Sequence, residues 1–418
     1  MANTGSPSNQ PRRGPMPTVT LVEIGDDALD PSAGKEALSA LDYALFLQAA
    51  NAFDPAVVAV LPVLEFPRPQ PEYERILLNQ ALRTPKLLIA VQPNGPTPAR
   101  PPVNAPPAIT PEAIVAPLRH VQGDTNALPE LRELDRRPAE RLLLTAAACG
   151  PTSTQAPDRA SATAAAAALV RTVPLLFRTS TGDVLPAFTL QAAMLWLQLT
   201  PDEIRVELPR YIQLGNRLRV PVDAAGALRL DVRPFGRQLS RIDLDDLLLA
   251  SNEKNGEAPT PAANASPASA VAPDAGALKA IAGGTLLLGR TDRQSRTLAL
   301  PTGDRVTPAE LQALAMVDLQ THAFIQRAPL GYDALVIAAL LVFGWSLVPL
   351  RRSLGLALVF ALLLVYTLIA LMIFDFGRLW LPWAMPTGAL AVLAVLIAVL
   401  PHPAADHAAA ASEAAARQ

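Results

Sequence analysis

Charged residues that directly follow apolar segments are the best candidates for chemistry in this chain. Six of them come after segments that we expect to be buried strands: Asp26, Asp27, Glu65, Arg290, Asp292 and Arg293. In an open α/β sheet, small molecules bind beyond the carboxyl ends of the strands. These six side chains would then surround one rim of the sheet and form a ligand-binding site. An ordinary solvated rim is the alternative, and both interpretations stay open.

Sequence signatures of catalysis are missing. His322 falls on the apolar side of an expected helix, and no His or Cys lies at metal-ligand spacing from it. A partly buried structural histidine is therefore favoured over a catalytic or metal-binding one. The chain contains no Gly-x-Ser-x-Gly or Walker sequence, and Gly283–Gly284 precedes a strand instead of joining a strand to a helix. We expect neither an enzyme nor a cofactor or metal site.

Two further groups have simple structural interpretations. Asp243, Asp245 and Asp246 could hold a cation, but we interpret them as a helix start, where acidic side chains complement the helix dipole. Cys149, the single cysteine, follows leucines and alanines, which predicts an inert core residue and excludes an internal disulfide. A net charge of −2, without basic runs interleaved with aromatic residues, argues against nucleic-acid binding.

Strands and helices alternate after residues 1–17, a polar stretch that we expect to be disordered. Three β-branched, apolar runs predict buried strands: Val19–Ile24, Ala56–Val60 and Lys86–Val91. Apolar residues at helical spacing predict the intervening helices, Lys35–Ala52 and Pro71–Arg83. This alternation indicates parallel strands joined by crossover helices. The predicted fold class is α/β, a mixed sheet with flanking helices.

The second half of the soluble part mixes strands and helices. Strands are expected at Arg141–Ala147, Leu169–Thr179 and Gly283–Gly289, and antiparallel hairpins at Glu203–Leu208, Tyr211–Leu214, Arg217–Val220 and Ala227–Val232. Helices are expected at Ala187–Leu199, Ile242–Ala250 and Thr307–Arg327, the last with a capped start at Thr307–Glu310.

Two stretches rich in proline or alanine, residues 93–111 and 251–276, are expected to be flexible insertions. One strand and one helix cannot form a domain beyond the second insertion, so Gly283–Gly289 should return to the first sheet. Residues 18–330 are therefore predicted to form a single soluble domain.

Three uncharged segments follow residue 333: residues 334–350, 353–374 and 379–400. Uncharged runs of about 20 residues suit a bilayer core, so we predict three transmembrane helices and a short tail, residues 401–418. Arg351–Arg352 should stay cytoplasmic under the positive-inside rule. The expected protein is a multi-pass protein of the inner membrane, with an extracytoplasmic domain and a cytoplasmic tail. Because Met1–Pro17 contains no targeting signal, we expect a hydrophobic segment upstream of Met1.

A series of pieces follows one another in a recognisable order: Thr18–Leu29, Arg171–Leu175, Pro186–Phe188, Leu214–Gly226, Gly284–Gly289, Thr307–Pro308 and His322–Ala323. Together they resemble the CHASE2 sensor domains of bacterial receptors, including an R-x-V-P-L strand, a P-x-D-x-x-G turn and a late strand bounded by glycines. In that family three membrane helices typically follow the domain. The resemblance implies an extracytoplasmic α/β sensor domain.

The chain departs from the family pattern in several places. Gly25 and Leu61 stand where family members usually carry acidic residues, and no membrane helix precedes the domain. No output domain follows the last membrane segment either. We therefore predict a membrane-anchored sensor that binds an unknown small molecule or periplasmic ligand and signals through a separate partner. A second copy of the chain is a further candidate partner, besides the lipid bilayer. The alternative is a structural or assembly membrane protein that uses the fold without a ligand.

Overall fold

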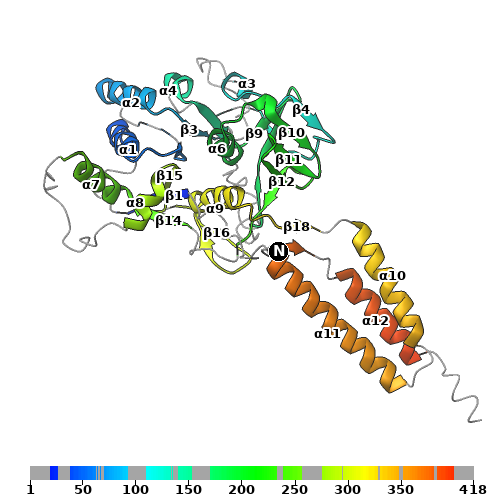
Figure 1. The fold of residues 1–418 in the computed structure, drawn as a ribbon. Helices are drawn as coiled ribbons and strands as arrows, with labels where there is room; N and C mark the ends of the chain where they lie inside the picture. Colours follow the sequence, from blue (N-terminus) through cyan, green and yellow to red (C-terminus); the bar gives the residue numbers. More distant parts are fainter. Residues whose placement is uncertain are drawn as a thin grey trace, which may run out of the picture. The chain divides into compact units, whose positions relative to one another are not determined.

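The computed structural model divides into two compact units, Met1–Phe324 (unit 1) and Ile325–Gln418 (unit 2). The described residues are 19–26, 38–62, 64, 66, 70–92, 110–132, 134, 140–152, 170–232, 239–256, 275–293, 295–327, 330–347, 352–380 and 384–399. Unit 1 ends close to the expected domain boundary at residue 330. It contains the largest sheet and the helices that cover it (Figure 1).

A six-stranded sheet forms the centre of unit 1. Its order is β14 (Ser240–Asp243), β1 (Val19–Ile24), β15 (Thr285–Arg290), β2 (Val57–Val60), β3 (Leu87–Val91) and β6 (Ala148–Pro151). Every pair in it is parallel, so the expectation of a mixed sheet is wrong for these strands. The return of the Gly283–Gly289 segment to this sheet is confirmed, because β15 lies between β1 and β2.

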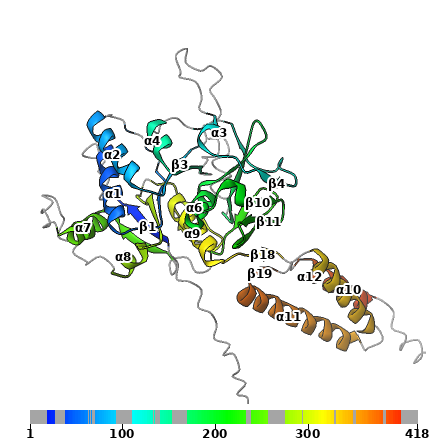
Figure 2. The ribbon, with the colours of Figure 1, turned by 45° about the horizontal axis from the view of Figure 1, so that its top comes forward.

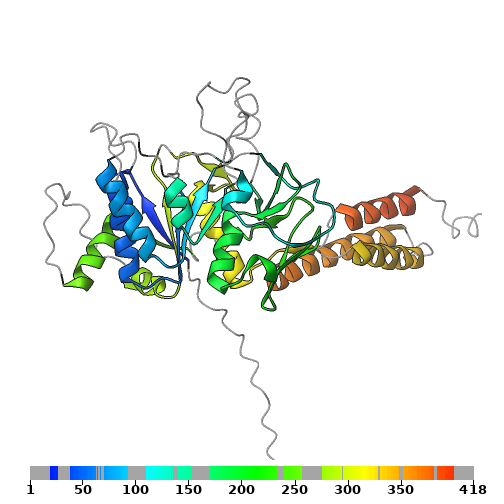
Figure 3. The same ribbon diagram turned by 90° about the horizontal axis from the view of Figure 1, so that it is seen from above.

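The connections explain why the helices gather on one face. From β1 to β2, β3 and β6, and again from β14 to β15, the chain steps in the same direction along the sheet. Right-handed crossovers that step one way place their helices on one side. These helices are α1 (Ala40–Ala52), α2 (Pro71–Arg83), α4 (Glu140–Thr145), α7 (Leu244–Asn255) and α8 (Ala275–Ile281). Figure 3 shows the helices beside the sheet. Their apolar side chains share one core with that face.

The opposite face of the sheet is covered by α6 (Phe188–Leu197) and α9 (Pro308–Thr321), which lie side by side (Figure 2). Both helices also pack against a second layer of small sheets, and this layer has its own apolar core. As a result α9 is buried on all sides, and every residue from Ala309 to Gln320 is buried. An amphipathic pattern is therefore absent from this helix, because it has no solvent face.

The second layer consists of short strands. A four-stranded sheet has the order β12 (Leu218–Pro221), β11 (Tyr211–Leu214), β10 (Ile204–Glu207) and β4 (His120–Gln122). A three-stranded sheet contains β5 (Glu130–Leu131), β8 (Leu176–Thr179) and β9 (Val184–Pro186), and two pairs join β13 (Ala227–Arg229) to β7 (Thr172–Pro174) and β16 (Leu298–Ala299) to β17 (Arg305–Val306). The short helices α3 (Pro111–Ile114) and η1 (Pro201–Glu203) complete it. Antiparallel pairing of β10, β11 and β12 confirms the expected hairpins for the first three of the four runs. The hairpin expected for the fourth run is wrong, because β13 pairs antiparallel with β7 instead of with β12.

Some expected elements differ from the structure. Arg141–Ala147 is not a strand, because Ala148–Pro151 takes the place beside β3 and the leucines before it pack as helix α4 against α2. The last helix of unit 1 ends at Thr321 instead of Arg327, since His322 adopts a left-handed backbone with φ 56°. Residues 93–109 and 257–274 of the two expected insertions lie outside the described residues. Within the second insertion, α7 continues to Asn255 and α8 begins at Ala275.

Unit 2 contains α10 (Leu330–Leu347), α11 (Arg352–Gly377) and α12 (Ala384–Val399), and a parallel pair of β18 (Gln326–Arg327) and β19 (Leu379–Trp380). Among the described residues, one helical segment, Ser353–Phe374, is long and apolar enough to cross a membrane. Its 22 residues span about 33 Å, which matches a hydrocarbon core of about 30 Å. Large side chains on it face outward, with Phe360 65% and Leu364 63% exposed. Of the third expected segment, residues 379–400, Leu379 and Trp380 belong to β19 and Ala384–Val399 form α12.

Candidate functional site

Two groups of charged side chains lie at the carboxyl end of β1. Residues alternate along this strand, so that Val19, Leu21 and Glu23 face α9, while Val22 and Ile24 face the opposite core. Glu23 is thus a carboxylate on the strand face that α9 covers. It lies opposite Asp243 of β14 and Gly289 of β15 in the sheet register.

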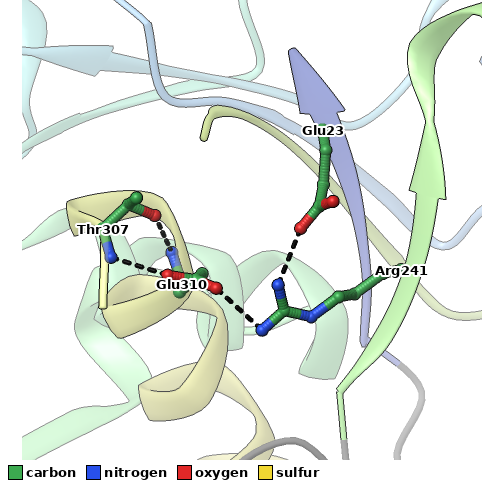
Figure 4. A network of polar contacts seen from close by, with 4 residues as sticks. All are labelled: Glu23, Arg241, Thr307 and Glu310. Atoms are coloured by element: carbon green, nitrogen blue, oxygen red, sulfur yellow. Dashed lines mark hydrogen bonds and ion pairs between the residues drawn. The ribbon is translucent and has the colours of Figure 1, made fainter. Parts of the chain in front are cut away.

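Arg241 of β14 connects Glu23 to α9. Its Nη1 donates to Glu23 Oε1 at 2.9 Å, and its Nη2 contacts Glu310 Oε1 at 2.7 Å (Figure 4). The side chains are largely enclosed, with 35% of Arg241, 20% of Glu23 and 11% of Glu310 exposed. We call Glu23, Arg241, Thr307 and Glu310 the inner network. It joins two strands of the sheet to the first turn of α9.

Glu310 uses its two carboxylate oxygens for different tasks. The backbone N–H of Thr307 donates to Oε2 at 2.6 Å, and the N–H of Glu310 donates to Thr307 Oγ1 at 3.3 Å. This reciprocal capping box begins α9 and confirms the capped start expected from the sequence. The other oxygen, Oε1, remains for Arg241. One side chain therefore both caps the helix and fastens it to β14.

Gly289 allows α9 to approach the sheet. A Cβ at this position would collide with the Cβ of Ala309, the residue before Glu310. Because no side chain separates β15 from the first turn of α9, Glu310 comes within reach of a guanidinium on β14. The close approach of backbones is a common reason for glycine inside a strand.

Burial leaves the inner network with a carboxylate that is easy to protonate. Desolvation raises the pKa of Glu23, while the charge and hydrogen bond of Arg241 lower it, and the net change is upward. Asp243 and Glu310 add to the rise, since both bring negative charge near Glu23. One arginine thus faces two largely enclosed carboxylates, and Glu23 gains a proton more readily than a fully exposed glutamate.

Four of the six predicted ligand-binding residues come together in the structure; Asp27 and Glu65 lie outside the described residues. The Arg290 Nε and Nη2 donate to the two oxygens of Asp292 at 3.1 and 3.0 Å, and Ser295 Oγ donates to the same carboxylate. The Arg293 side chain pairs with Asp26 at 3.1 Å, and its N–H donates to Asp26 Oδ1 at 2.9 Å. We call these five residues the rim cluster.

The rim cluster differs in exposure from one pair to the other. Asp292 is 5% exposed, and although burial raises its pKa, hydrogen bonds from Arg290 and Ser295 outweigh this and lower it. In the other pair, 93% of the Arg293 side chain and 49% of the Asp26 side chain are exposed. Water screens such a pair strongly. The Asp26–Arg293 pair is therefore the part of the cluster that a charged ligand could open.

Other sequence predictions have mixed outcomes. Asp243 is the N-cap of α7, with Asp245 and Asp246 in its first turn, as expected. Cys149 is buried, which confirms the expected core position, and desolvation raises the pKa of its thiol to about 12. The prediction that His322 is partly buried is wrong. His322 is the exposed C-cap of α9, and its ring stacks on that of Phe324 with 6.2 Å between the ring centroids. The helical spacing gave a wrong prediction because α9 ends at Thr321, one residue before His322.

Two further findings concern possible metal sites and hollows. No group of three or more His, Cys, Asp or Glu side chains that could hold a metal occurs in the described part of the chain. A hollow of about 190 Å³, between Asn51, Asp54, Arg83 and Lys86, lies at the opposite ends of β2 and β3, away from both charged groups. The arrangement at β1 therefore consists of ion-paired and hydrogen-bonded charged side chains.

The inner network was missed at the sequence level. Glu23 interrupts the apolar face of a buried strand, which is the signal that could have identified it. Its partners, Arg241 and Glu310, are more than two hundred residues away along the chain. Comparison of the chain with protein-family models, with curated proteins and with solved structures found no match.

Proposed function

We propose that this chain is a membrane-anchored sensor whose unit 1 binds a ligand at the rim cluster and whose unit 2 carries the response to a separate partner. The observation that supports it best is the position of α9. This helix is fastened at its first turn to β1 and β14 by the inner network, and only residues 322–329 separate its end from α10. A change at the sheet rim has a direct covalent route to the membrane segments.

The proposed anchor consists of three transmembrane helices formed by α10, α11 and α12. Support comes from the apolar length of Ser353–Phe374 and from the apolar residues that the three helices share, Leu340, Val359, Leu390 and Leu393. We propose an extracytoplasmic unit 1 and a cytoplasmic tail, with Arg351–Arg352 on the cytoplasmic side. The chain has no enzymatic role in this proposal, and its resemblance to CHASE2 sensor domains stays a prediction.

Single-cysteine labelling in intact cells tests the topology. In a Cys149→Ser background, Glu253→Cys lies on the exposed face of α7 and Ser412→Cys in the tail. A membrane-impermeant maleimide should label the first in intact cells and the second only after permeabilisation. Labelling of both from the same side would contradict three crossings.

Ligand binding is tested with the full chain in lipid nanodiscs. The rim cluster offers two arginines and two aspartates, so the probes are a dicarboxylate (succinate), a zwitterion (glycine) and a diamine (putrescine). A ligand at ten times its Kd should slow the reaction of buried Cys149 with a thiol reagent about tenfold, because it stabilises the folded state. The double variant Asp26→Ala with Arg293→Ala should lose the effect. Absence of any response, with a normal cellular phenotype for the double variant, would favour the structural alternative.

A further inference from the structure

The outer face of the four-stranded sheet in unit 1 is open to solvent. Along β10, Ile204 and Val206 point into the core, while Arg205 is exposed. The same alternation leaves Arg219 of β12 and His120 of β4 exposed and Gln213 of β11 half-buried. The β10–β12 hairpins therefore have one apolar face and one polar face.

Two arginines, a histidine and a glutamine on this face form a line across the strands. In the sheet register Arg219 lies opposite Gln213, Gln213 opposite Arg205, and Arg205 opposite His120. Neighbouring strands are about 4.8 Å apart, so the line is about 14 Å long. No carboxylate stands in it. We call these four residues the basic row.

The nearby carboxylates are already occupied. Arg210 pairs with Glu207 at 2.7 Å, Arg119 pairs with Asp202 at 3.1 Å, and Glu203 closes the capping box of η1. A hydrogen bond from Tyr211 and the neighbouring arginines lower the pKa of Glu207, which stays ionised beside its partner.

The arginines of the basic row keep their charge available. In the described part of the chain Arg205 makes no ion pair, and Arg219 lies over the ring of Tyr211 at 5.2 Å from the ring centre. A ring beneath a guanidinium holds it in place without neutralising it. The face is thus positive in a chain with a net charge of −2.

We propose that the basic row binds the anionic headgroups of a lipid bilayer. A protein interface needs an apolar centre with large side chains. The large exposed apolar residues described in unit 1 lie elsewhere, on α1, α2 and α7: Leu45, Ile76, Leu82 and Leu249. A headgroup layer requires only positive charge. This inference rests on the proposed function in one respect, since the membrane anchor keeps a bilayer within reach of unit 1.

The test uses the full chain in nanodiscs of neutral phosphatidylcholine, with an environment-sensitive dye on Gln122→Cys in a Cys149→Ser background. Gln122 is exposed on β4 beside the basic row. Vesicles of phosphatidylcholine with 30% phosphatidylglycerol, added from outside, should change the dye signal, and vesicles of pure phosphatidylcholine should not. A dye on Glu253→Cys of α7 should respond to neither, and 0.5 M NaCl should suppress the response.

Charge reversal identifies the row. Each arginine near an anionic surface strengthens partitioning about fivefold, so Arg205→Glu with Arg219→Glu should weaken binding about 25-fold or more. Arg75→Glu with Arg83→Glu on α2 changes the net charge equally and should have little effect. Equal loss in the two double variants would overturn the proposal, as would equal binding to neutral vesicles. A response to poly-glutamate without one to lipid would overturn it in favour of an acidic protein partner.

The two proposals can fail separately. If the chain does not insert, it is recovered outside the membrane fraction, and the vesicle titration can be run on that soluble protein. Binding there would keep the basic row as a lipid site while refuting the anchor. Insertion into the membrane without a response to anionic vesicles would support the anchor and refute the basic row as a lipid site.

Discussion

The inner network and the rim cluster use the same chemical groups at the same end of β1, yet they differ in how water reaches them. Arg241 meets Glu23 and Glu310 between the sheet and α9, whereas Arg293 meets Asp26 with 93% of its side chain exposed. Ion pairs of similar length therefore contribute very differently to the stability of unit 1. Removing one partner of the enclosed pairs should lower the unfolding free energy strongly, whereas removing one partner of the exposed pair should change it little.

The largest effect should come from Arg241→Leu. It leaves two enclosed carboxylates without this guanidinium, and the unfolding free energy of unit 1 should fall by about 2–4 kcal/mol. Cys149 is 2% exposed and is the single cysteine, so its reaction with a thiol reagent measures opening of unit 1. The reaction should become about 100-fold faster. Arg293→Leu is the matched control, with a change below about 1 kcal/mol; equal effects of the two variants would remove the contrast.

Gly289→Ala should break the inner network without touching the rim cluster. The new methyl group collides with Ala309, which pushes the first turn of α9 away from β15. Overpacking of this kind costs about 1–3 kcal/mol. Thermal unfolding of the full chain in detergent measures the loss. Adding Ala309→Gly should recover part of it; a double variant no better than Gly289→Ala would show that the collision is not the cause.

Asp292→Asn should remove an acid-sensitive part of the stability. The pKa of Asp292 is lowered in the folded state, so its contribution is present above the unfolded value of about 3.9 and is lost as the pH falls through the lowered value. The variant should lose about 1–2 kcal/mol at pH 7, which corresponds to its charged hydrogen bonds. Urea unfolding followed by circular dichroism at several pH values measures this. If the unfolding free energy of the variant fell at acid pH as steeply as that of the wild type, Asp292 would not be the group responsible.

Glu23→Gln should have the smallest effect and the opposite pH dependence. The folded-state pKa of Glu23 is raised, so its contribution is fully present below about 4.3 and is lost as the pH rises through the raised value. Glutamine cannot ionise, and the variant should lack this decline while differing by less than about 1 kcal/mol at pH 7. The same urea series checks it. A decline that persists in the variant would place the titrating group elsewhere.

Local patterns predicted the elements of unit 1 well where one face of an element decides its structure. Val19–Ile24 is a strand as expected, and α2 covers Pro71–Arg83 as expected. The leucines at 142–144 fit strand and helix equally, and pairing of the next four residues with β3 decided the outcome. Burial of α9 on all sides removes the pattern that would have located its face and its end.

The candidate site was predicted only in part, for a physical reason. Asp26, Arg290, Asp292 and Arg293 end adjacent parallel strands, and strand ends can be read from the sequence. Contact between Glu23, Arg241 and Glu310 depends on the order of strands and on the close approach at Gly289. Neither is encoded locally. The position of β15 between β1 and β2 could not be derived from the order of segments along the chain.

The central position of α9 has a consequence for how the protein is made. Synthesis runs from the N-terminus, but β15 and α9 come late in unit 1, and both lie in its interior. Until residue 290 has left the ribosome, β1 and β2 lack the strand between them, and until residue 321 has left it, two apolar layers lack the helix that joins them. Unit 1 therefore matures while the apolar segments of unit 2 are emerging. Chaperone demand should peak in that interval, since large apolar surfaces of both units are exposed together.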